Sequence, residues 1–61
     1  MQTYYYCPEV DGNFYELASC LVASVQEANR RKEPLEVFRL LEYTDGQQSI
    51  HLCTIHPAWE S

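Results

Sequence analysis

The sequence predicts an α+β fold of order β-α-β-β, with one amphipathic helix packed on one face of a three-stranded, mainly antiparallel sheet. Three observations lead to it. An alternating aromatic run opens the chain, a segment with helical periodicity follows, and two β-rich runs around an Asp-Gly pair close it. With 61 residues, the chain has room for a single domain over 1–61.

The tyrosine run "QTYYYC" predicts the first strand. Successive side chains of a strand face opposite sides of a sheet, so Tyr4 and Tyr6 point one way and Tyr5 points the other. One helix can cover only one face of a three-stranded sheet. We therefore expect Tyr5 to pack in the core and Tyr4 and Tyr6 to lie on the uncovered face.

A helix is expected from about Phe14 to Arg31, after the turn residues of "CPEVDGN". Asn13 and Glu16 have the spacing of a capping box at its start. At its end, the basic triplet 30–32 complements the helix dipole, and Pro34 stops the helix. The triplet could instead bind an acidic partner or a phosphate. Apolar residues recur at helical spacing: Phe14, Leu17, Ala18, Leu21, Val25 and Ala28.

A hairpin is expected around "TDGQ", with strands at about Leu35 to Tyr43 and Gln48 to Ile55. Two registers remain open. A two-residue turn places the odd-numbered residues of the first of these strands beside Ile50, Leu52 and Thr54. A three-residue turn with a bulge at the glycine brings the even-numbered residues beside Ile50 and Leu52.

The tyrosine strand has two ways to join this hairpin. Because antiparallel pairs are the more frequent, we expect it to pair with the last strand. The alternative is a right-handed crossover onto the middle strand. In either arrangement the face without the helix keeps a surplus of apolar side chains.

Charge and leader sequences narrow the class of protein. Nine acidic against four basic residues give a net charge of −5, which disfavours direct binding to nucleic acid. The chain shows neither a basic leader nor the roughly 20 apolar residues of a membrane span. Three cysteines without close pairing argue against a disulfide scaffold. We expect a reduced, cytoplasmic protein, located in the host cell if the chain is phage-encoded, with no membrane partner.

The run "HLCTIH" is the main candidate for chemistry. Alternation places His51 and Cys53 on one strand face with His56 close by, and imidazole and thiolate are preferred zinc ligands. However, structural zinc sites usually use close pairs such as C-x-x-C, so we predict no metal and no cofactor. A cysteine nucleophile would also need an oriented base and an oxyanion pocket, for which so short a chain has little room. We therefore predict no catalytic residues and no enzyme activity.

The aromatic surplus indicates a protein-binding surface, since Tyr and Trp are enriched at binding hot spots. We expect this surface to dock on a second copy of the chain, giving a homodimer, on another protein, or on both. The expected partner-binding residues are Tyr4, Tyr6, Phe38, Leu40 and Trp59. The expected core consists of Tyr5, Leu17, Leu21, Val25 and Leu41.

These observations predict a small acidic, non-enzymatic protein-binding module. By analogy alone, it fits an inhibitor carried by a phage or mobile element that occludes a larger host protein. The alternatives are an accessory subunit of a larger complex, a small zinc or redox domain, and a compact monomer whose rings simply pack. A nucleic-acid mimic is a further alternative, if folding gathers Glu9, Asp11, Glu16 and Glu60 onto one edge.

Overall fold

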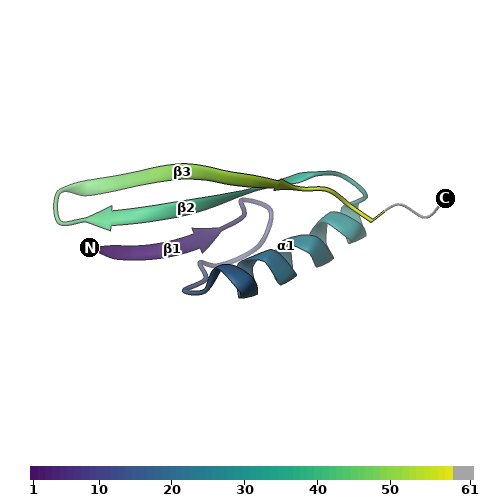
Figure 1. The fold of residues 1–61 in the computed structure, drawn as a ribbon, viewed down its shortest axis with the longest axis horizontal. Helices are drawn as coiled ribbons and strands as arrows, with labels where there is room; N and C mark the ends of the chain where they lie inside the picture. The colour runs from purple at the N-terminus through teal and green to yellow at the C-terminus, as the bar shows by residue number, and fades with distance from the viewer. Residues whose placement is uncertain (59–61) are drawn as a thin grey trace.

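A computed structural model describes residues 1–58 of the chain. Its elements are the strand β1 (Gln2–Tyr6), the helix α1 (Leu17–Arg31) and the strands β2 (Leu35–Tyr43) and β3 (Gly46–Ile55). Figure 1 shows the three strands side by side with the helix along one end of the sheet. The predicted α+β fold of order β-α-β-β is confirmed.

The strand order of the sheet is β1-β2-β3, and both neighbouring pairs are antiparallel. The expected pairing of the tyrosine strand with the last strand is therefore wrong. The alternative named the right neighbour, β2, but its crossover, which joins parallel strands, is wrong because the pair is antiparallel. The reason lies in the path of the helix. It runs in the same direction as β1, so the chain re-enters the sheet at the far end and β2 returns antiparallel along β1 (Figure 1). The hairpin then places β3 on the other side of β2.

The hairpin turns over two residues, because Tyr43 pairs with Gly46 across Thr44 and Asp45. β3 thus starts two residues earlier than the predicted Gln48. The two-residue register holds up to His51, after which the pairing shifts by one residue.

This shift is a bulge at Leu52, which has no partner on β2. Its neighbours His51 and Cys53 pair with two consecutive residues of β2. Phe38 pairs with His51, whereas Val37 pairs with Cys53. The bulge reverses the alternation expected beyond it. Thr54 consequently pairs with Glu36, although the two-residue register predicted it on the odd-numbered face.

The helix begins at Leu17, three residues later than predicted, and ends at Arg31 as predicted. Its late start follows from Phe14, whose backbone N–H and C=O are both bonded to Tyr5, at 2.8 and 2.7 Å. Phe14 therefore belongs to the sheet edge. Glu16 is the N-cap residue and makes no side-chain cap bond, so the predicted capping box is wrong. The C-cap residue of the helix is Lys32, which has the left-handed backbone conformation with φ 59°.

Small residues form the buried side of α1. Cys20, Ser24 and Ala28 recur four residues apart and are each fully buried. Leu17 and Val25, predicted in the core, are 38% and 40% exposed, so that expectation is wrong. Because small side chains let the helix backbone approach the sheet closely, the larger apolar residues are displaced to the sides of the contact.

The core lies at one end of the molecule. Cys7, Ala28 and Leu35 form its buried cluster, with Val10 and Ile55 packed against it. The hairpin end of the sheet extends past the helix (Figure 1), and the principal extents are 48 × 16 × 15 Å. The radius of gyration of 12.4 Å exceeds the value of about 10.5 Å for a compact chain of this length. Three other predicted core residues are only half-buried: Tyr5, Leu21 and Leu41.

Candidate protein-binding face

The sheet register places four of the five predicted partner-binding residues on one face. Tyr4 is the register partner of Leu40, and Tyr6 is the partner of Phe38. Directly opposed residues of antiparallel strands share a face. The odd-numbered residues of β2, including the buried Leu35 and Val37, lie on the side of the sheet that the helix packs against. We call the face that carries Tyr4, Tyr6, Phe38 and Leu40 the open face.

An aromatic row crosses all three strands on the open face. The rings of Tyr6 and Phe38 stack with centroids 5.3 Å apart and planes 19° from parallel. The rings of Phe38 and His51 make a T-shaped contact, with centroids 5.5 Å apart and planes at 70°. The hydroxyl of Tyr6 also shares a 2.7 Å hydrogen bond with Ser49 Oγ. The strand ladder and these contacts together support the row.

Tyr15 extends the open face beyond β1, and sequence reasoning missed it. Its ring lies 5.2 Å from that of Tyr4, and the residue is 74% exposed. Partial desolvation raises the pKa of Tyr4, and neighbouring Tyr15 and Glu42 raise it further. No sequence pattern indicated the position of Tyr15, because it depends on the backbone bridge between Phe14 and Tyr5. Since Phe14 lies on the same face as Tyr5, the next residue faces the open side.

Carboxylates flank the aromatic row. Glu36 accepts a 2.8 Å hydrogen bond from Thr54 Oγ1 and pairs with His51 Nε2. The bond from Thr54, followed by that from His51, lowers the pKa of Glu36. On the other side of the row, Glu42 accepts a 3.1 Å hydrogen bond from Gln47 Nε2. The open face is therefore apolar in its centre and acidic at its margins.

The four lysine and arginine residues of the chain all lie within residues 1–58, and each is placed away from the open face. Arg30 and Arg31 both bind Glu27, the latter through a 2.6 Å contact, and these hydrogen bonds lower the pKa of Glu27 to about 2. Lys32 is the C-cap residue of α1. Arg39 is the register partner of Tyr5 and Ile50 on the helix side of the sheet. The geometry of 30–32 thus fits a helix-end role.

The bulge separates two of the candidate metal ligands. His51 faces the open side opposite Phe38, whereas Cys53 faces the helix side opposite Val37. The expectation that His51 and Cys53 share a face is therefore wrong. Over residues 1–58, no group of three His, Cys, Asp or Glu side chains is arranged to hold a metal ion.

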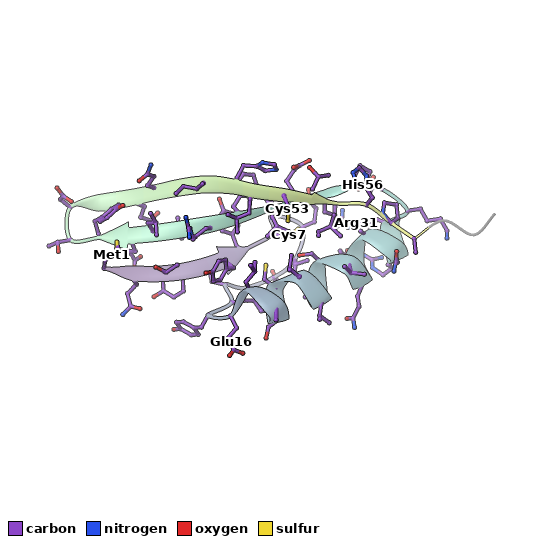
Figure 2. All side chains as sticks on the ribbon, in the orientation of Figure 1. Met1, Cys7, Glu16, Arg31, Cys53 and His56 are labelled. Atoms are coloured by element: carbon purple, nitrogen blue, oxygen red, sulfur yellow. The ribbon has the colours of Figure 1, made fainter. Side chains whose placement is uncertain are left out.

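Cys53 instead lies near the free thiol of Cys7, where the helix meets the sheet (Figure 2). The free thiol of Cys20, on α1, interacts electrostatically with both. Burial raises the pKa of both Cys7 and Cys20. A raised pKa lowers the fraction of thiolate, the form that nucleophilic catalysis needs. The sequence alone could not predict this grouping, because the three cysteines come from separate elements.

Two residues of the predicted sites, Trp59 and Glu60, lie outside the described residues. The other acidic residues proposed for a nucleic-acid mimic, Glu9, Asp11 and Glu16, are exposed. No helix within residues 1–58 has the length and apolar character needed to cross a membrane.

No protein-family model, curated protein or solved structure matches the chain.

A second apolar surface lies on the side of α1 away from the sheet, and sequence reasoning missed it too. Val22 is 58% exposed at its centre, beside a shallow depression of small side chains. We call this surface the helix outer face. Its residues are Ala18, Ser19, Val22, Ala23 and Gln26.

Proposed function

We propose that the chain is a non-enzymatic protein-binding module that uses its open face to cover part of a larger protein. The observation that carries the proposal is the aromatic row of Tyr6, Phe38 and His51 on a face without a covering helix. Rings that are already fixed in place lose little entropy on binding. A module of this kind could inhibit its partner by occlusion, as expected from the sequence.

The charge of the open face indicates the chemistry of the partner. Glu36 and Glu42 flank the aromatic row, and the bases of the chain lie elsewhere. A complementary surface would have an apolar centre with lysine or arginine at its rim. The net charge of −5 would speed association with such a basic protein and oppose binding to nucleic acid.

An accessory subunit of a larger complex is a second candidate, favoured by the small core at one end of the molecule. Thermal unfolding of the isolated chain separates the two candidates. A cooperative transition well above room temperature supports an independent module. A chain that is unfolded alone and gains structure only with its partner supports the subunit.

The test of the proposed function is affinity capture from the cells that make the chain. The baits are the unmodified chain, Tyr4→Ala, Tyr6→Ala and the matched control Val22→Ala on the helix outer face. Circular dichroism first establishes that each bait is folded. We expect one protein to be retained by the unmodified chain and by Val22→Ala, and lost from both tyrosine variants. Equal retention by all four baits, or no retained protein, would contradict the proposal.

A further inference from the structure

The two edges of the sheet differ. The outer edge of β1 is occupied by Phe14, which exchanges two backbone hydrogen bonds with Tyr5. The outer edge of β3 has no neighbouring strand among residues 1–58, and β3 is ten residues long. An exposed edge of this length presents a row of unpaired backbone donors and acceptors.

β3 also lacks the features that usually keep such an edge from pairing. Proteins protect exposed edges with charged side chains, proline, short strands or bulges. The β3 sequence GQQSIHLCTI contains no Lys, Arg, Asp, Glu or Pro. Its bulge at Leu52 lies beyond the regular segment that runs from Gly46 to His51. That regular segment is left open to a strand of another chain.

The register shows which backbone groups point outward. Gly46 closes a two-residue turn with Tyr43, a position at which the two residues exchange backbone hydrogen bonds. Gly46, Gln48 and Ile50 therefore direct their N–H and C=O groups toward β2, and the residues that alternate with them direct these groups away from β2. Within the regular segment these residues are Gln47, Ser49 and His51.

We propose that β3 pairs antiparallel with β3 of a second copy, around a two-fold axis at Ser49, to form a continuous six-stranded sheet. Gln47 then lies opposite His51 of the second copy, and Ser49 lies opposite itself. Such an isologous contact closes the edge on both copies.

Charge does not oppose a second copy at the β3 edge. Each copy carries a net charge of −5, so a contact between carboxylate-bearing surfaces of two copies would be repulsive. β3 contributes no carboxylate to the contact, and Gln48 lies opposite Ile50 of the second copy on the helix side. A two-fold axis perpendicular to the sheet also leaves both open faces on the same side. The dimer therefore goes beyond the proposed function and does not compete with it.

Opposite charges at Ser49 provide the test. In sedimentation at about 100 µM, a concentration suited to micromolar affinity, we expect the unmodified chain to be a dimer. Ser49→Lys and Ser49→Glu should each be monomeric, because the axis brings two like charges face to face. An equimolar mixture of the two variants should regain the dimer. Ser49→Ala, which loses only the bond to Tyr6, and Gln2→Lys, which adds charge away from β3, should both remain dimeric.

Amide hydrogen exchange checks the same contact without a variant. On dilution of the unmodified chain below its dissociation constant, exchange at Gln47, Ser49 and His51 should accelerate by about tenfold or more, while exchange at Gln48 and Ile50 should change little. A monomeric unmodified chain, a Ser49→Lys chain that stays dimeric, or exchange independent of concentration would overturn the proposal.

Discussion

Tyr6 of β1 stacks on Phe38 of β2, with ring centroids 5.3 Å apart, at a position where the two residues are register partners. Such a cross-strand pair contributes about 0.5–1.5 kcal/mol beyond the burial of its area. The pair lies on the face opposite the helix, so the contact stabilises a surface and does not belong to the buried core.

The core prediction concerns Leu35, which is 2% exposed and lies in the buried cluster. We expect Leu35→Ala to lower the free energy of unfolding by about 2–5 kcal/mol, enough to unfold much of so small a chain. Leu17→Ala is the matched control, because Leu17 is 38% exposed, and should cost less than about 1 kcal/mol. Urea unfolding of both variants measures the difference. Equal costs would mean that the core is misplaced.

Because α1 contacts the sheet through small residues, a larger side chain at this contact should destabilise the chain. Ala28 is fully buried against the sheet, so Ala28→Leu should destabilise the chain by about 1–3 kcal/mol through overpacking. Val22→Leu adds volume on the helix outer face and should be nearly neutral. Thermal unfolding compares the two. A stable Ala28→Leu chain would show that α1 does not approach the sheet through Cys20, Ser24 and Ala28.

Acid should destabilise the chain through Glu27 and Glu36. Hydrogen bonds lower the pKa of Glu27 to about 2 and also lower that of Glu36. Their stabilising contribution is therefore complete above the unfolded value of about 4.3 and is lost as the pH falls through the folded values.

Thermal unfolding between about pH 6 and pH 2 tests this expectation, since the Tm should fall over the acid limb. Glu27→Gln should lower the Tm at neutral pH and flatten its acid dependence. Glu16→Gln is the control, because Glu16 makes no side-chain cap bond, and should keep the full dependence. An unchanged slope in Glu27→Gln would contradict the assignment.

We expect that replacing Arg39 will stabilise the chain. Its Nε atom is buried without a hydrogen-bond partner in the described part of the chain. Arg39→Met keeps the apolar stem and removes the unsatisfied donor, so we expect the free energy of unfolding to rise by about 1 kcal/mol. Arg39→Lys, which also removes Nε but keeps a charge, should gain less. Urea unfolding is the measurement, and a loss of stability in Arg39→Met would show that the guanidinium has a stabilising role.

Local patterns predicted most of the elements. The bounds of β2 and the end of α1 at Arg31 match the expectation, because alternation, Pro34 and the basic triplet are signals within a few residues. The start of α1 differed because Phe14 found backbone partners on Tyr5, a contact between separate segments. Likewise, the pairing of β1 with β2 depends on the direction of the helix, which periodicity does not encode.

The sequence predicted the composition of the open face but not the bulge beside it. Alternation alone placed Tyr4 and Tyr6 on one face, and the register added Phe38 and Leu40. The bulge at Leu52 carries no glycine or proline signal, so the separation of His51 and Cys53 could not be foreseen. Helical periodicity also could not choose between the larger apolar stripe of α1 and the adjacent stripe of small residues, because both recur at the same spacing.

The most direct test of the central claim is to map the amide resonances of the chain on addition of the protein captured in the affinity experiment. The open face should respond, with the largest shifts at Tyr4, Tyr6, Phe38 and Leu40. Residues of the helix outer face, such as Ala18 and Val22, should shift little. Shifts centred on the helix outer face, with the aromatic row unaffected, would contradict the assignment of the open face as the protein-binding surface.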